Sequence, residues 1–160
     1  MFVVYIKMNI RKGIRSDIPA VFRLVNELAL FEKLPEAVTV SIAEMEKDGF
    51  GENPIFSFYV AEVDSEIVGI AVYYVKYSTW KGRGLYLEDL IVTEKMRGKG
   101  IGRKLFDAYL SEAKKIGAKQ AHWQVLDWNS PAVEFYKKLG ASIEPEWWDC
   151  KLTEEQINNE

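Results

Sequence analysis

Apolar side chains recur along the chain with two different periods, which predicts a succession of strands and helices. An apolar stretch over residues 3–14 predicts a first strand. The helix expected after it carries one apolar stripe: Ile18, Val21, Phe22, Val25, Leu28 and Ala29. Ser41 and Glu44 match a capping box, so we expect a second, shorter helix to begin there and to end at Gly49 and Gly51.

The middle of the chain predicts a pair of antiparallel strands. They cover residues 55–63 and 67–80 and are joined by a tight turn at Asp64 and Ser65. The second strand is almost wholly apolar over residues 67–75, as expected of a central strand that is covered on both faces.

The second half alternates strands with helices. The pattern predicts a strand from Leu85 to Val92, a helix from Ile101 to a glycine cap at Gly117, and a strand over residues 121–126. A last helix is capped by Asn129 or Ser130, has Pro131 in its first turn and ends at Gly140. Hairpin-joined strands followed by strand–helix crossovers predict an α/β fold with a mixed, mostly antiparallel sheet and helices on both faces.

Composition limits the class of protein and the partners that the chain can have. At 160 residues, 48% of them hydrophobic and 28% charged, the chain predicts one soluble domain over residues 1–160, with its core at about residues 8–153. The net charge of −3 argues against a nucleic-acid partner. One cysteine and one histidine argue against a disulfide and a metal site. The single Cys150 is typical of a reducing compartment, so we expect a cytoplasmic protein. Lys7, Arg11 and Lys12 interrupt the apolar N-terminus, so we expect no membrane span there.

A basic, glycine-rich turn lies between the Leu85 strand and the helix that follows. Its residues are Arg97, Gly98, Lys99, Gly100, Ile101, Gly102 and Arg103. Glycines let backbone N–H groups approach an anion at a helix N-terminus, so this turn predicts a pyrophosphate site. It is not a Walker loop, because Lys99 is followed by Gly100 and not by Ser or Thr. It is not a dinucleotide fingerprint, because Arg103 stands where the third glycine is required.

The spacing Arg97-x-x-Gly100-x-Gly102 resembles the acetyl-CoA loop of the GCN5-related N-acetyltransferases. Further matches follow in the family's order: Asn129, Pro131, Phe135-Tyr136 and Leu139-Gly140-Ala141. Three other segments resemble the diamine and polyamine branch, which includes the spermidine/spermine and thialysine acetyltransferases: Glu27-Leu28-Ala29 with Glu32, the run from Asp48 to Pro54, and Tyr86-Leu87-Glu88-Asp89. The similarity covers about residues 14–152.

The resemblance implies a splayed sheet, acetyl-CoA as the cofactor, no metal and a homodimer. It places the cofactor on the turn from Arg97 to Arg103, on the backbone of Leu90, Ile91 and Val92, and on the helix start at Asn129, Ser130, Pro131 and Ala132. Exposed apolar residues near an expected C-terminal strand, among them Trp147 and Trp148, are candidates for the dimer interface or the substrate site.

Acetyl transfer to an amine requires a base, because an alkyl ammonium has a pKa of ~10. Glu88 is the candidate base, since a carboxylate on an apolar strand is costly without a role; a structural ion pair is the alternative. Strand alternation sends Glu88 and Asp89 to opposite faces, so they share one site only if the strand bulges, as it does in the family. By resemblance Tyr136 is the acid for the thiolate; by pattern alone it is a core aromatic.

The expected amine site combines acidic and aromatic residues: Phe31, Glu32, Trp80, Glu88, Asp89, His122, Trp123, Gln124 and Trp147. His122 is either a substrate contact or a hydrogen-bonded structural residue. Ser78 stands where the polyamine branch has an Asp, which favours short diamines or thialysine-like amines over long polyamines. A protein or peptide N-acetyltransferase and a non-catalytic acyl-CoA sensor are the alternative functions.

Overall fold

The computed structural model describes residues 7–159, and the chain divides into two compact units between Gln124 and Val125. A five-stranded sheet forms the centre of the first unit, in the order β1 (Met8–Lys12), β2 (Ser57–Val63), β3 (Glu66–Ser78), β4 (Gly82–Val92), β5 (Gln120–His122). Neighbouring strands are antiparallel, except that β5 runs parallel to β4. The predicted mixed, mostly antiparallel sheet is therefore confirmed.

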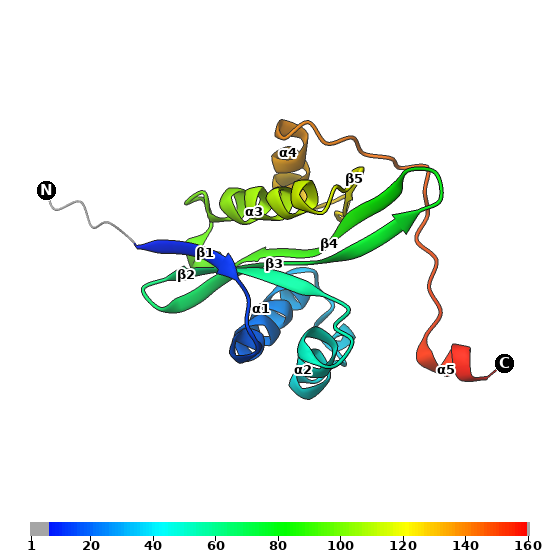
Figure 1. Ribbon diagram of the computed structural model, residues 1–160, viewed down its shortest axis with the longest axis horizontal. Coiled ribbons are helices and arrows are strands. Elements are labelled where there is room, and N and C mark those ends of the chain that lie inside the picture. Colours follow the sequence, from blue (N-terminus) through cyan, green and yellow to red (C-terminus); the bar gives the residue numbers. More distant parts are fainter. Residues whose placement is uncertain (1–6, 160) are drawn as a thin grey trace, which may run out of the picture. The chain divides into compact units, whose positions relative to one another are not determined.

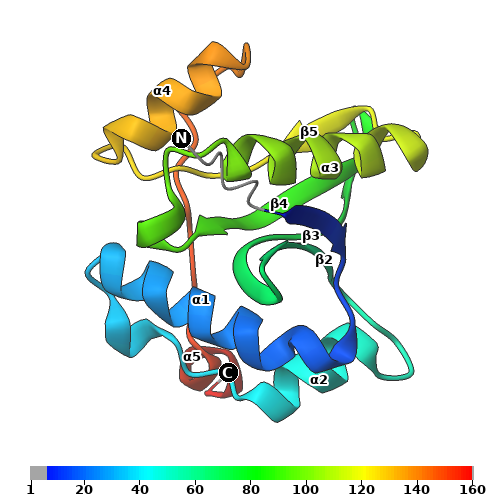
Figure 2. The same ribbon diagram turned by 90° about the vertical axis from the view of Figure 1, so that its left-hand side faces the viewer.

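Helices cover both faces of this sheet, as predicted. Helices α1 (Ile18–Phe31) and α2 (Ile42–Phe50) lie on one face and α3 (Ile101–Lys115) on the other (Figures 1 and 2). Short 3₁₀ turns, η1 (Arg15–Asp17), η2 (Pro35–Ala37) and η3 (Glu94–Met96), connect them. The predicted capping box starts α2, where the backbone N–H of Glu44 donates to Ser41 Oγ over 3.2 Å.

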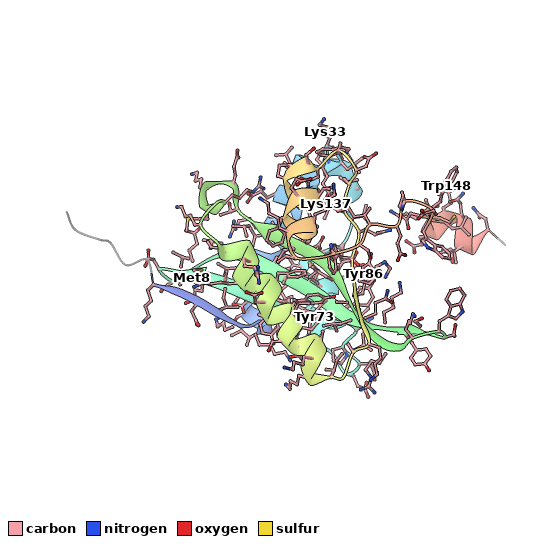
Figure 3. The ribbon with its side chains drawn as sticks, turned by 90° about the horizontal axis from the view of Figure 1, so that it is seen from above. Met8, Lys33, Tyr73, Tyr86, Lys137 and Trp148 are labelled. Carbon is pink, nitrogen blue, oxygen red and sulfur yellow. The ribbon has the colours of Figure 1, made fainter. Side chains whose placement is uncertain are left out.

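Each face of the sheet has its own core. Beneath α1, a cluster of fully or nearly buried residues joins helix and sheet: Ile18, Val21, Leu24, Phe58, Val60, Ile70, Val72 and Ile91. Under α3, Tyr73 of β3 packs against Tyr109, with ring centroids 6.1 Å apart (Figure 3). The buried Tyr109 hydroxyl donates to the Leu85 carbonyl over 2.6 Å and so satisfies its polar end.

A tight turn and one glycine explain where the first two strands end. The two-residue turn predicted between β2 and β3 is confirmed, with positive φ at Asp64 (49°) and Ser65 (68°). Strand β1 ends before Gly13, whose backbone N–H donates to the Phe58 carbonyl. A Cβ at Gly13 would lie 1.9 Å from the Phe58 ring, so only glycine fits there. Of the predicted first strand, residues 3–6 lie outside the described residues.

Strand β5 is shorter than predicted. It covers Gln120–His122 and not residues 121–126, and it pairs with β4 only from Gly84 to Tyr86. Among residues 7–159, no strand pairs with this edge of β4 beyond Tyr86. Backbone pairing and not apolar composition defines a strand, so the apolar residues after His122 remain outside the sheet. The sheet is open along the second half of β4.

The second unit contains α4 (Ser130–Lys138) and α5 (Glu154–Asn158). Asn129 caps α4 by accepting a hydrogen bond from the Ala132 N–H, and Gly140 (φ 82°) follows the helix, as predicted. The expectation of a strand near Trp147 and Trp148 is wrong, because residues 141–153 pair with no strand. Helix α5, which begins at a Thr153 capping box, was not predicted. No helix among the described residues is long and apolar enough to cross a membrane.

Candidate active site

A cavity of about 500 Å³ lies on the α1 and α2 side of the sheet. Seven apolar or aromatic residues and three acidic residues line it: Val25, Val40, Met45, Ile55, Phe56, Val72, Tyr74, Asp48, Glu88 and Asp89. An apolar wall with a few convergent carboxylates suits a molecule with a methylene chain and a cationic end.

A bulge in β4 brings two of these carboxylates together. Val72 of β3 pairs with Asp89, but the next residue, Tyr73, pairs with Leu87, so Glu88 is an extra residue in β4. Without this extra residue, Glu88 and Asp89 would point to opposite faces of the sheet. Both instead line the same cavity, as the sequence required if they were to share one site.

Negative charge is concentrated at this point. Burial and the neighbouring carboxylates of Glu88 and Glu32 raise the pKa of Asp89 to about 7. Burial also raises the pKa of Glu32, which directly follows α1. Because the charges of Glu88 and Glu32 disfavour the ionisation of Asp89, a cation bound beside Asp89 would relieve this repulsion.

Tyr74 is a site residue that the sequence analysis missed. Its ring stacks on Tyr86, with centroids 5.2 Å apart. Burial, and the charge of Glu88 together with a hydrogen bond to it, raise the pKa of Tyr74 to about 12, so the hydroxyl keeps its proton at neutral pH. The available signal was strand parity, because Tyr74 lies two residues after Val72 and therefore faces the same side. Asp48, which also lines the cavity, was not predicted as a site residue; it appeared only within the segment from Asp48 to Pro54 that resembles the polyamine branch.

His122 and Gln124 lie beside the same tyrosine pair. The Tyr86 hydroxyl donates to Gln124 Oε1 over 3.2 Å, and the His122 ring meets the Tyr86 ring edge-on at 5.2 Å (Tyr86 is labelled in Figure 3). His122 Nδ1 also lies 2.8 Å from Lys76 Nζ. Tyr86 in turn stacks on Tyr74, so these residues border the cavity through the tyrosine pair.

Other expected substrate residues lie elsewhere. Trp123 packs edge-on against Phe106 of α3, which covers the opposite face of the sheet. Trp80 does not line the cavity: it lies at the β3–β4 turn and is 85% exposed. Ser78 Oγ accepts hydrogen bonds from the N–H groups of Trp80 and Lys81 and so shapes that turn. Trp147 belongs to the second unit and is exposed.

The glycine turn has the backbone of an anion site. Gly98 (φ 74°) and Gly100 (φ 77°) adopt the left-handed conformation that favours glycine, and Gly100 is the N-cap of α3. The Lys104 N–H donates to the Gly100 carbonyl, so the preceding N–H groups of residues 101–103 point out of the helix start. Arg103 is held by Asp107 at 2.8 Å, and Lys99 Nζ lies 3.4 Å from Met96 Sδ.

The open edge of β4 presents backbone groups next to this turn. The Thr93 N–H donates to the Val68 carbonyl of β3 over 2.8 Å. Strand alternation then directs the backbone groups of Ile91 toward β3 and those of Leu90 and Val92 toward the open edge. Arg97 Nε donates to the Val92 carbonyl over 2.9 Å. Of the three expected backbone donors, Leu90 and Val92 are therefore the ones directed away from the sheet.

The second unit carries the remaining candidates. Tyr136 of α4 is 8% exposed, and burial raises its pKa to about 12. Its phenol therefore keeps its proton at neutral pH. The same helix begins at the Asn129 cap with Ser130, Pro131 and Ala132. Its N-terminus is therefore a second candidate anion-binding site.

Comparison with known proteins decides the family. The acetyltransferase (GNAT) family model matches residues 19–141, most of the chain. The chain belongs to the GNAT acetyltransferases. These enzymes transfer an acetyl group from acetyl-CoA to an amine, which agrees with the anion-binding turn and the acidic cavity described above.

Individual relatives agree with this assignment. The chain is 44% identical over 150 residues to the thialysine N-epsilon-acetyltransferase of Mus musculus, covering 88% of each chain. It is 42% identical over 151 residues to that of Bos taurus, covering 88% of this chain and 89% of the relative. Among solved structures, an integron cassette protein from the mobile metagenome of V. cholerae shares the fold of this chain (TM-score 0.77, 22% identity, 95% of this chain and 96% of that chain covered).

Asp89→Asn should stabilise the unliganded protein in a pH-dependent way. The folded-state pKa of Asp89 is raised to about 7, so ionising it costs folding free energy as pH rises from about 4 through 7. An amide carries no such cost. We expect a higher melting temperature for the variant at pH 8, corresponding to a gain of roughly 4 kcal/mol in stability at most, and a much smaller gain at pH 4.5. Thermal unfolding at both values measures this, with Asp107→Asn as control; an equal gain at both pH values contradicts the charge argument.

Gly100→Asp should weaken CoA binding roughly tenfold, because it adds negative charge and backbone strain at the helix start. Gly117→Asp is the matched control, since Gly117 has a similar positive φ (68°) at the other end of α3. Titration calorimetry with CoA compares the two folded variants. Equal affinities in both would show that the turn does not hold the cofactor.

Proposed function

We propose that this acetyltransferase modifies the primary amine of a small cationic substrate, a short diamine, a polyamine or a thialysine-like amino acid. The observation that carries the proposal is the apolar cavity into which the β4 bulge directs both Glu88 and Asp89. A substrate with an ammonium group and a methylene chain matches both parts of this lining. The thialysine acetyltransferases named above support the same class.

Electrostatic attraction between the substrate ammonium group and the acidic residues is the first step of binding. In the proposal Asp89 and Glu32 attract the ammonium group, while the apolar wall, including Val25 and Phe56, covers the methylene carbons. Binding a cation beside Asp89 lowers the pKa of that carboxyl from its raised value and favours its ionised form. Amine affinity should therefore rise with pH through about 7, as long as the amine stays protonated.

The reaction then needs a neutral amine. Glu88 accepts the ammonium proton, directly or through water, and the nitrogen lone pair attacks the carbonyl carbon of the acetyl thioester. The N–H groups directed to the open edge of β4, Leu90 first, stabilise the negative charge that develops on the carbonyl oxygen. The carbon–sulfur bond breaks, the acetylated nitrogen releases its second proton to solvent, and Tyr136 gives its proton to the CoA thiolate. The products are the acetylated amine and CoA, and solvent restores the two protonation states.

The proposal also includes a homodimer in a reducing, cytoplasmic setting. Trp147 and Trp148, which are 75% and 89% exposed, and the exposed Leu152 offer apolar surface for a second copy of the chain. The thiol of Cys150 in the same segment is exposed, which suits a reducing compartment.

An amine panel tests the function. The purified protein is incubated with acetyl-CoA and thialysine, lysine, 1,4-diaminobutane, spermidine, spermine or a peptide, and products are identified by mass spectrometry. We expect thialysine or the short diamine to have the highest kcat/KM, because the carboxylates of the cavity, Asp48, Glu88 and Asp89, lie within one small site and the relatives named above are thialysine acetyltransferases. Turnover of the peptide alone would make the chain a peptide acetyltransferase. CoA binding without any product would make it a sensor.

Tyr136→Phe should separate binding from catalysis. The variant keeps the ring and loses the acidic hydroxyl, so kcat should fall roughly 10²-fold while the Kd for CoA stays the same. Tyr77→Phe, on an exposed tyrosine of β3, is the control. Wild-type kcat in the Tyr136 variant would assign this side chain to packing only.

A further inference from the structure

Helix α1 is tied to the segment that leads into the cofactor turn. The Glu27 carboxylate accepts a hydrogen bond from Thr93 Oγ1 at Oε2 and one from the Glu94 N–H at Oε1, each 2.9 Å long. Thr93 is the N-cap of η3, yet its own side chain makes no capping bond. Glu27 supplies that acceptor from a distant part of the sequence, so the direction in which η3 leaves β4 depends on α1.

A second contact lies one helical turn further on. The Arg97 guanidinium lies over the Phe31 ring, 5.1 Å from its centroid. The same side chain donates to the Val92 carbonyl through Nε. Glu27 and Phe31 are four residues apart and therefore share a face of α1. That face follows the chain from Thr93 to Arg97, directly before Gly98 and Gly100.

The same helix also forms part of the amine cavity. Val25 of α1 lines the cavity. Glu32, the C-cap of α1, is close enough to Asp89 for its charge to act on that carboxyl. The same helix therefore contacts the approach to the cofactor turn and lines the amine cavity.

We propose that Glu27 is a positioning residue that ties the cofactor turn to α1 and thereby couples acetyl-CoA binding to amine binding. The inference rests on the proposed amine cavity. Cofactor bound on the turn holds η3, and η3 holds α1 through Glu27, so α1 is already ordered when the amine enters the cavity. By linkage the effect is reciprocal: the factor by which CoA tightens the amine is the factor by which the amine tightens CoA.

The test compares the amine Kd with and without CoA. Thialysine is the probe, and CoA without an acetyl group prevents turnover. We expect saturating CoA to tighten thialysine binding about fivefold or more in the wild type. Glu27→Ala should reduce this ratio to about 1, and Glu27→Gln should keep part of it, because its amide oxygen still accepts from the Glu94 N–H. Glu66→Ala, an exposed carboxylate at the start of β3, should keep the full ratio.

Thr93→Val removes one of the two hydrogen bonds and provides a second variant if Glu27→Ala does not fold; we expect an intermediate ratio. A wild-type ratio of 1, or an unchanged ratio in a folded Glu27→Ala or Thr93→Val protein, overturns the proposal. So does a Glu27→Ala protein that only melts earlier and keeps its coupling.

A measurement without amine separates this proposal from the function. If no amine of the panel binds, the proposed function fails, and hydrogen exchange then decides the coupling. CoA should slow amide exchange in residues 24–32 of the wild type but not of Glu27→Ala. Equal protection by CoA in both proteins, or none in the wild type, overturns the role of Glu27.

Discussion

One extra residue in β4 is the constraint on which the rest of the site depends. Side chains alternate along a strand, so two adjacent carboxylates ordinarily face opposite ways. The shift in register between Val72 and Tyr73 leaves Glu88 unpaired in the ladder and places it beside Asp89 at one cavity. The proton acceptor and the cation-binding carboxylate in our mechanism are thus neighbours in sequence and in space.

In our mechanism the same strand also supplies the backbone groups that meet the cofactor. Beyond Tyr86, β4 has no strand on its β5 side within residues 7–159, so the backbone groups of Leu90 and Val92 are directed to an open edge. Strand β4 then leads through η3 into the left-handed glycines that begin α3. The proposed amine site, the backbone donors and the glycine turn therefore follow one another along a single stretch of chain. This continuity limits how far the three can move apart.

The acidic site carries a cost in the unliganded protein. Raising the pKa of Asp89 to about 7 means that charging this cavity at neutral pH opposes folding. In our mechanism the cationic substrate cancels part of that cost, so some of its binding energy comes from relieved repulsion. The Tyr74 hydroxyl also lines this cavity and, because its pKa is raised to about 12, adds no negative charge to it at neutral pH.

Local patterns in the sequence by themselves determined helices α1 to α4 and the turn between β2 and β3. The stripe of α1, the Ser41 capping box, the Asp64–Ser65 turn and the glycines around α3 all depend on residues close together in the chain, and the structure confirms them. The spacing from Arg97 to Gly102 also indicated the family. These features are encoded locally, because backbone conformation and helix amphipathicity depend on neighbouring residues.

Only the tertiary structure decided what depends on distant partners. The length of β5 follows from which residues pair with β4, and the apolar residues after His122 carry no sign of where pairing stops. The contact of Trp123 with Phe106 and the exposure of Trp80 likewise depend on other elements of the fold. The interactions of Tyr74 with Glu88 and of Glu27 with Thr93 and Glu94 were not apparent, because each joins residues that are remote in sequence. Strand pairing, side-chain burial and the electrostatic environment of a residue depend on neighbours from the whole fold. These neighbours cannot be identified from a single sequence.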